Sequence, residues 1–459
     1  MTIPAPSPSE PPHPLDSGSE AQYEIDKLMA LHPKGFDLSL ERITRLLERL
    51  GNPHERLPPA IHVAGTNGKG SCAAVSRALL EADGKSVHVH TSPHLVRWHE
   101  RFRLGSKDGP GQIVDDAVLA DAVRRVADAN GGEMITVFEI LTAVMFVLFS
   151  EHPADVAIVE VGLGGRFDAT NVIKSPAVSV IMPIGLDHEA YLGDRIELIA
   201  MEKAGIMKPG VPVVIGYQEN EVAREVLTDT AERRGCPMAV YGQDFFAFEE
   251  HGRMVFQSQA GLMDLPLPKL AGRHQLSNAA AALAAVATAG FEIQQETAER
   301  ATAEIIWPAR MQRLTEGPFP ALLPAGSELW LDGGHNPHAA MMVAETLAGM
   351  QDRMERPLFL IAGMLNTKDT DGYFGAFEGM VRHVFTVPIT DSDAGVDPEV
   401  LAESAGRAGL TAQPMKSVEE VLRLLGEGWN RLEPAPRVLI GGSLYLAGEV
   451  LGDNGTPPQ

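Results

Sequence analysis

A glycine-rich segment with an internal lysine, residues 65–71 (GTNGKGS), carries the most specific chemical signal in the sequence. It follows the β-prone run 60–64 (AIHVA) and precedes a helical stretch, the context that a phosphate-binding loop requires. Its glycines let backbone N–H groups converge on phosphate oxygens, while Lys69 would reach the terminal phosphates and Ser71 a metal ion. The segment departs from G-x-x-x-x-G-K-[ST], because Gly70 separates the lysine from the hydroxyl. A glycine-rich turn without a ligand is the alternative, and the internal lysine argues against it.

Two further positions predict a metal site at the same edge of the sheet. Glu160 ends the apolar run that begins at Val156, and Asp187-His188 closes the run that begins at Val178. Open α/β sheets bind ligands at the carboxyl ends of their strands, where these residues lie. Oxygen ligands beside a triphosphate favour Mg²⁺ over zinc. Taken singly, a loop-capping glutamate and a structural histidine remain the alternatives.

Three residues elsewhere have side chains suited to the same chemistry. Lys203 follows a short helical stretch, and without a family precedent a solvated surface lysine is the better interpretation. Asp332 and His335, in LDGGHNPH, occupy a strand-to-helix turn that is either structural or part of a site.

Alternating strand-like and helix-like segments position these residues. Runs rich in Val and Ile alternate with helical patterns, which predicts a mostly parallel sheet covered on both faces. We therefore expect an α/β protein with a phosphate-loop (P-loop) N-terminal domain at 21–306 and a smaller Rossmann-like α/β C-terminal domain at 307–459. Residues 1–20, rich in Pro, Ser and Glu, are expected to form a disordered arm, and the final residues GDNGTPPQ to fray.

Composition limits the partners and the compartment. The formal net charge of -23 disfavours binding to a phosphate backbone, so we expect no nucleic-acid partner. Two cysteines far apart suit a reducing compartment, and the N-terminus has no secretory pattern. The apolar run 138–149 contains Glu139 and is too short to span a membrane. A cytoplasmic protein that binds small molecules is expected; oligomeric state is left open, with a monomer as the default.

The motifs taken together resemble the folylpolyglutamate synthase and dihydrofolate synthase family of the Mur-ligase superfamily. Those that carry the resemblance are GTNGKGS, TSPHL, TVFE, EVGLGGRFDATN, GLDH, EKAGI, HQLSN and DGGHNP, and they stand in family order between about Tyr23 and Leu451. Three positions depart from the usual pattern. Ser39 replaces a common Gly, Gly334 a common Ala, and the linker reads PARMQ where PGRLE is more familiar.

The resemblance implies a role for each matching residue. ATP is implied to be held by Asn67, Gly68, Lys69, Gly70 and Ser71, and across the domain junction by Asn278, Arg310 and Asp332. Two Mg²⁺ ions are implied to be served by Ser71, Ser92, Glu160, His188 and Lys203, the last as a carbamate. The pterin end of the substrate is implied to meet Asp37, Leu38, Ser39, Leu40, Thr136, Val137, Phe138, Glu139, Phe167, Asp168 and Ala169. Catalytic roles are implied for Lys69, Lys203, His188 and His335.

The implied reaction joins glutamate to a folate-type carboxylate through an acyl phosphate, releasing ADP and phosphate. Its acceptor is dihydropteroate, the glutamate tail of a folate, or both. A second hypothesis is a ligase of the same superfamily that acts on a cell-wall precursor. A third is a nucleotide-binding switch without ligase activity, which would turn over ATP without a folate or an amino acid.

Overall fold

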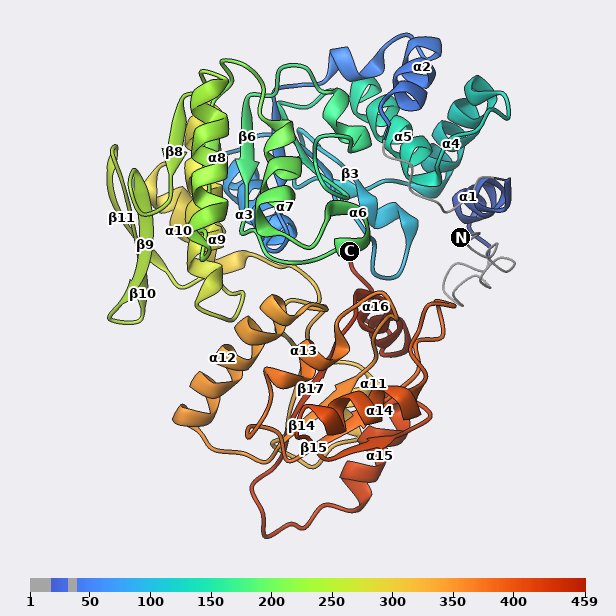
Figure 1. Cartoon of the computed structure of the whole chain (residues 1–459), viewed down its shortest axis with the longest axis vertical. Coiled ribbons are helices and arrows are strands. Elements are labelled where there is room, and N and C mark those ends of the chain that lie inside the picture. The colour runs from blue at the N-terminus through green and yellow to red at the C-terminus, as the bar shows by residue number, and fades with distance from the viewer. Residues whose placement is uncertain (1–17, 32–38) are drawn as a thin grey trace.

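The computed structural model describes residues 18–31 and 39–459, which form two α/β units in series (Figure 1). Residues 1–17 of the expected arm lie outside the described residues, and helix α1 (Glu20–Leu31) begins at the end of that arm. The first unit contains an eight-stranded sheet, and the second a six-stranded sheet.

The first sheet is mostly parallel, as the sequence predicts. Its strands run in the order β4-β3-β2-β5-β1-β6-β7-β8, and β2, β5, β1, β6, β7 and β8 are parallel to their neighbours in that series. Only β3 and β4 pair in the antiparallel sense. The strand bounds are β1 (Ala60–Ala64), β2 (Val87–His90), β3 (Phe102–Leu104), β4 (Gln112–Ile113), β5 (Val156–Glu160), β6 (Val178–Ile181), β7 (Val213–Ile215) and β8 (Met238–Val240).

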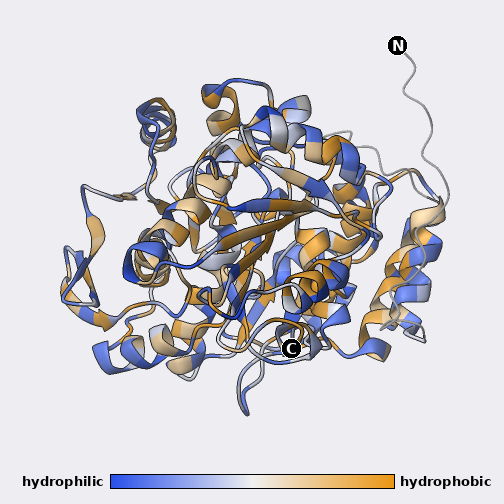
Figure 2. Cartoon of the chain, turned by 90° about the horizontal axis from the view of Figure 1, so that it is seen from below, coloured by the Kyte–Doolittle hydropathy of each residue, from blue (hydrophilic) through white to orange (hydrophobic). Residues whose placement is uncertain are grey.

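Helices cover both faces of this sheet because its strands are apolar on both sides, as the hydrophobic colour of the central strands shows in Figure 2. One face packs against α3 (Lys69–Ala82), α9 (His274–Thr288) and α10 (Gln295–Glu304). The other packs against α1, α2 (Glu41–Arg49), α4 (Asp116–Asn130) and α5 (Val137–Glu151). Near β6 and β7, a further core contains α7 (Ile196–Lys203) and α8 (Glu221–Arg233), with the short α6 (Glu189–Leu192) beside them.

A small antiparallel sheet extends from the side of the first unit (Figure 1). It contains β9 (Phe245–Glu250), β10 (Arg253–Ser258) and β11 (Gly261–Pro266). His251 and Gly252 both have positive φ at the β9–β10 turn, as a two-residue hairpin requires. None of these three strands was expected from the sequence.

The second sheet has the order β12-β13-β17-β14-β15-β16, and only β12 is antiparallel to its neighbour. Its strands are β12 (Gln312–Leu314), β13 (Glu328–Leu331), β14 (Leu358–Ala362), β15 (His383–Thr386), β16 (Ala412–Pro414) and β17 (Arg437–Gly441). One face packs against α12 (Pro337–Arg353), α13 (Thr370–Gly375) and α14 (Pro398–Arg407). The other packs against α11 (Pro318–Ala321), α15 (Val418–Glu427) and α16 (Leu444–Asp453).

The linker between the two units has an unusual backbone conformation, and the last residues are more ordered than the sequence predicts. Ala309 and Met311, on either side of Arg310, have φ of 53° and 41°, a conformation that L residues rarely adopt. The expected fraying of the last residues is wrong. Asn454 is buried, and its side chain accepts from Phe319 N and donates to Glu316 O.

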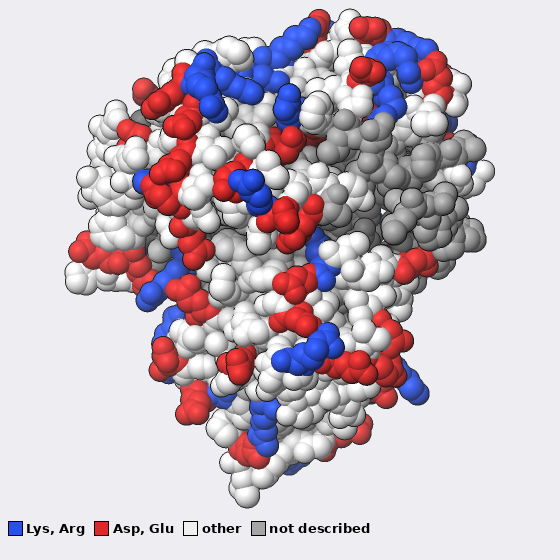
Figure 3. Space-filling model, viewed as in Figure 1, with Lys and Arg blue, Asp and Glu red and all other residues white. Residues whose placement is uncertain are grey.

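Two features of the described residues bear on membranes and on surface charge. No helix in residues 18–31 and 39–459 is long and apolar enough to cross a bilayer. On the face drawn in Figure 3, acidic and basic side chains are interspersed.

Buried histidines in the first sheet predict how stability depends on pH. Burial lowers the pKa of His62 to about 3 and that of His90 to about 4. Below pH 6.5 these histidines are therefore protonated in the unfolded chain but stay neutral in the folded chain. Each of the two histidines should lower the free energy of unfolding by about 1.4 kcal/mol per pH unit, until the pH reaches its pKa in the folded state. Glu160 acts in the opposite direction, because its raised pKa favours the folded state as pH falls from about 7.

The variant His90→Gln tests this account by urea unfolding at pH 7 and pH 5. Its free energy of unfolding should change less between the two pH values than that of the wild type, and equal changes would contradict the account.

Candidate active site at the domain junction

The phosphate loop bends sharply between β1 and α3. At Gly65 a Cβ would lie 2.6 Å from the Cβ of Met182, so this position has no room for a side chain. Gly68 has φ of 81°, and α3 begins at the next residue, Lys69. A Cβ on Gly68 would lie 2.6 Å from Asn278 Oδ1, so the predicted ATP ligand Asn278 stands directly against the loop. The N-terminus of α3 therefore faces the loop, as phosphate binding requires.

Two lysines converge on one carbonyl of this loop. Lys69 Nζ donates to Gly65 O at 3.0 Å and to Thr66 O at 3.2 Å, and Lys203 Nζ donates to Gly65 O at 3.0 Å. Burial lowers the pKa of Lys69, although Glu160 and Asp187 oppose this. Burial and the charge of Lys69 lower the pKa of Lys203 to about 7. Lys203 is only 5% exposed, so the interpretation of it as a solvated surface lysine is wrong.

Glu160 lies beside this pair, at the end of β5. It is paired with Val63 of β1, one residue before the strand ends, and is 6% exposed. Burial raises its pKa to about 7, opposed by the charges of Lys69 and Arg310 and by the N–H of Ser92. A buried carboxylate with this much unfavourable desolvation suits a divalent cation, which would favour its charged form.

Asp187 and His188 follow β6, but their side chains differ in how far they are exposed to solvent. Asp187 is nearly buried, whereas the His188 side chain is 43% exposed, and the two are 3.9 Å apart at their nearest charged atoms. Burial would raise the pKa of Asp187, but the hydrogen bond from His335 and the charges of His335, His188 and Lys368 hold it well below its ordinary value. Among the described residues, no three His, Cys, Asp or Glu side chains are grouped as a metal site.

The second domain contributes the turn after β13. Asp332 Oδ2 accepts from Met311 N at 2.8 Å and Oδ1 from Gly334 N at 2.7 Å, so this carboxylate ties the linker to the turn. Arg310 lies against the same turn, because a Cβ on Gly333 would come within 2.9 Å of its Nη1. Burial raises the pKa of Asp332, and the charge of Arg310 opposes this.

Direct hydrogen bonds join the phosphate loop to the second domain. Asn67 Nδ2 is 2.8 Å from His338 Nδ1 and 3.4 Å from Asn336 Oδ1, and Asn336 Nδ2 donates to Asn67 Oδ1 at 3.3 Å. His335, on the same turn, places Nε2 3.6 Å from Asp187 Oδ2. The carboxyl edges of both sheets therefore meet at one junction.

The residues expected to meet a pterin lie near the start of α5. Asp37 and Leu38 fall outside the described residues, whereas Ser39 and Leu40 are half-buried just before α2. Thr136 and Glu139 cap α5 reciprocally, at 3.1 Å and 2.9 Å, and enclose Val137 and Phe138. Arg42 Nε donates to Glu139 Oε2 at 3.1 Å and thereby links α2 to α5.

The loop after β5 packs against that helix. A Cβ on Gly162 would lie 2.4 Å from Phe138 Cζ, so the ring rests on the loop backbone. Asp168 accepts hydrogen bonds from Gly162 N, Leu163 N and both N and Oγ1 of Thr170, so its carboxylate shapes the loop. Ala169 is buried, and Phe167 is 37% exposed, with the Arg166 guanidinium over its ring at 5.1 Å from the centroid.

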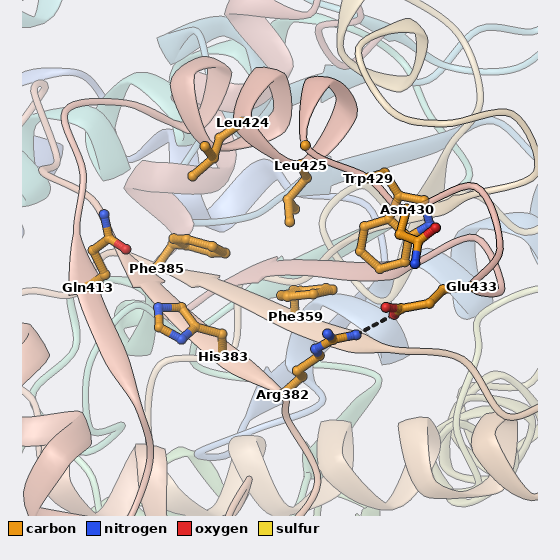
Figure 4. Close-up of a pocket in the computed structure, with 11 residues that line it drawn as sticks. Phe359, Arg382, His383, Phe385, Gln413, Leu424, Leu425, Trp429, Asn430 and Glu433 are labelled. Carbon is orange, nitrogen blue, oxygen red and sulfur yellow. Dashed lines mark hydrogen bonds and ion pairs between the residues drawn. The ribbon is translucent and has the colours of Figure 1, made fainter.

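A separate hollow of about 450 Å³ lies at the amino-terminal ends of β14 and β15 (Figure 4). It is lined by Phe359, Phe385 and Trp429, with an ion pair between Arg382 and Glu433 at 2.5 Å. None of the predicted site residues lines it, and it occupies the opposite end of the strands from the junction.

Sequence reasoning missed Lys368, Asn336 and His338. Lys368 Nζ is 2.6 Å from Asp187 Oδ1 across the junction. Lys368 stands in the polar stretch NTKDTD, which has no periodicity or motif that marks it. Asn336 and His338 could have been predicted as site residues, because they belong to the GGHNPH turn that the sequence already indicated.

Comparison with known families identifies both units. The Mur ligase middle domain matches residues 63–286, and the Mur ligase, glutamate ligase domain matches residues 310–444. The dihydrofolate synthase/folylpolyglutamate synthase of Mycobacterium tuberculosis is 37% identical over 397 residues, covering 81% of this chain and 78% of that protein. The Escherichia coli protein of the same name is 31% identical over 430 residues, covering 93% and 94%.

Solved structures give the same picture. Escherichia coli FolC in complex with DHPP and ADP superposes with a TM-score of 0.82 at 30% identity, covering 95% of this chain and 97% of that one. The bifunctional folylpolyglutamate synthase/dihydrofolate synthase of Yersinia pestis, complexed with AMPPNP and Mn ion, superposes with a TM-score of 0.81 at 29% identity, covering 96% and 99%.

Proposed function

Since the chain belongs to the dihydrofolate synthase/folylpolyglutamate synthase family of ATP-dependent amide ligases, we propose that its single site performs both reactions of that name. It adds the first glutamate to dihydropteroate, and it extends the glutamate tail of a reduced folate. Both substrates offer a carboxylate to the same phosphate loop. Relatives named for both activities support this reading.

The observation that carries the proposal is the meeting of the phosphate loop and the second domain at Asn67. Its hydrogen bonds to Asn336 and His338 place the loop against the DGGHNP turn. A terminal phosphate held by the loop would therefore face the second domain, where the glutamate ligase module lies. Phosphoryl transfer and amide formation then share one enclosed space.

ATP is held from both sides of this space. Asn67, Gly68, Gly70 and Ser71 offer backbone and side-chain groups to the phosphates, and Lys69 neutralises charge on the transferring group. Asn278 and Arg310 contact the nucleotide from α9 and the linker. Asp332 is the third contact proposed on this side, and its carboxylate also holds the linker through the backbone hydrogen bonds described above.

Two Mg²⁺ ions complete the site in this proposal. Ser71, Ser92, Glu160 and His188 would hold them, and they would supply charge stabilisation of the phosphoryl oxygens. Lys203 contributes as a carbamate. Its low pKa favours the neutral amine that reacts with CO₂, and the product replaces a cation crowded against Lys69 by an anion.

The reaction has two steps. The substrate carboxylate attacks the γ-phosphorus of ATP, and ADP leaves. The amine of glutamate then attacks the acyl carbon, phosphate leaves with one former carboxylate oxygen, and the ammonium proton is lost. His335 lies at the junction, where its Nε2 faces Asp187 Oδ2, and we assign it a catalytic part at this place.

The pterin end lies between α2 and α5 in this account. Phe167 and Phe138 offer ring faces, and Ser39, Leu40, Thr136, Val137 and Glu139 form the surrounding wall, with Asp168 and Ala169 shaping the loop. Asp37 and Leu38, outside the described residues, extend the same segment.

We further propose a domain boundary at 306/307, an arm at 1–20, a cytoplasmic location and a monomeric state. The linker between α10 and β12 supports the boundary, since one sheet ends before it and the other begins after it. Small molecules are the expected partners.

A substrate panel tests the function. The chain is incubated with ATP, glutamate and either dihydropteroate, tetrahydrofolate or a cell-wall precursor, and the amide products are identified by mass spectrometry. Products are expected from the first two substrates, with ADP release that depends on both substrate and glutamate. Product from the cell-wall precursor alone, or ADP release without any acceptor, would contradict the proposal.

A further inference from the structure

Asp187 and Lys368 form a buried ion pair that joins the two domains. Lys368 Nζ is 2.6 Å from Asp187 Oδ1, and each side chain is 9% exposed. Asp187 follows β6 of the first sheet, and Lys368 lies between β14 and α13 of the second. Separation of the domains would leave each charge without its partner.

The other oxygen of the same carboxylate binds the catalytic turn of the second domain. Asp187 Oδ2 accepts from Asn336 Nδ2 at 3.1 Å and lies 3.6 Å from His335 Nε2. Asn336 in turn contacts Asn67 of the phosphate loop. One carboxylate thus connects two separate loops of the second domain with the loop that holds the transferring phosphate.

These contacts lie where the two domains meet around the expected acyl phosphate. An acyl phosphate reacts with water as well as with an amine, so its survival depends on closure of the domains around it. A buried ion pair is formed only when the domains are together, and breaking it leaves an uncompensated charge.

We propose that Asp187 is a positioning residue whose contacts with Lys368, His335 and Asn336 hold the domains closed over the acyl phosphate. The inference rests on the proposed ligase function and goes beyond it. Loss of the contact should waste ATP: the acyl phosphate forms, but water hydrolyses it before glutamate attacks.

The test measures the number of ADP molecules released per amide bond formed, with saturating dihydropteroate, ATP and glutamate. Wild type should release about one ADP per amide, as an enclosed intermediate requires. In Asp187→Asn and in Lys368→Met, the ratio of ADP to amide should rise about tenfold, as expected when a buried charge loses its partner. The double variant should be no more uncoupled than either single variant, because the two charges act as one unit.

Lys174→Met is the matched control. It removes a lysine that pairs with Glu55 at 2.6 Å on the exposed surface of the first domain, with 76% and 49% of the side chains exposed. Its coupling ratio should equal that of wild type.

Thermal melting separates closure from folding. If the Asp187 and Lys368 variants melt lower, or turn over more slowly, while their ratio stays near that of wild type, the pair is merely structural and the inference is overturned. A wild-type enzyme that forms no amide would instead refute the proposed function, and the inference with it.

Discussion

Lys69→Ala is expected to lower kcat by about 100- to 1000-fold, which is the usual effect of removing one group that stabilises a developing charge. Lys69 sits at the first position of α3, and its ammonium reaches back over the loop to Gly65 O and Thr66 O. ATP phosphates would draw it away from these carbonyls. Steady-state kinetics with dihydropteroate, ATP and glutamate checks the expectation.

Lys69→Arg is the informative companion variant. It keeps the positive charge but not the compact ammonium, so it should recover only part of the lost rate. Both variants should retain the wild-type melting temperature to within a few degrees, because the lysine contributes little packing. Near-normal turnover in Lys69→Ala would remove the loop from the mechanism.

Lys203→Ala is expected to lose at least about 100-fold in kcat, because the site loses an anionic ligand beside its metal ions. Lys203 is buried, lies against Gly65 O and has a pKa near 7. These three features suit a lysine that reacts with CO₂, and they would be costly in an ammonium with no other role.

Added formate should restore part of the activity of Lys203→Ala by supplying the missing oxygens, and should do nothing for Lys69→Ala. A crystal grown with ATP, Mg²⁺ and bicarbonate should show additional density on Lys203 Nζ. A plain lysine in that density, together with no rescue by formate, would contradict the carbamate.

The sequence predicted those parts of the molecule that depend on local pattern. Glycines before a helix identified the phosphate loop, and apolar runs ending in Glu160 and Asp187 placed both residues at the carboxyl edge of a parallel sheet. Such runs are local signals, because a parallel strand is buried on both faces.

Features that depend on how the two domains dock were not predictable. The role of Lys368 depends on its contact with Asp187, which lies 181 residues earlier in the chain. The hydrogen bonds from Met311 N and Gly334 N to Asp332 likewise depend on how the linker folds back onto the turn after β13. The β9–β11 sheet was missed because its strands are partly exposed and lack the continuous apolar runs that mark the buried strands of the first sheet.

The transfer of oxygen tests the central claim most directly. Dihydropteroate labelled with ¹⁸O in both carboxylate oxygens is converted with ATP and glutamate, and the released phosphate is examined by mass spectrometry. The account predicts one ¹⁸O atom in each phosphate, because the carboxylate oxygen that attacks ATP leaves with the phosphoryl group. Unlabelled phosphate accompanying amide formation would contradict the acyl phosphate, and with it the mechanism.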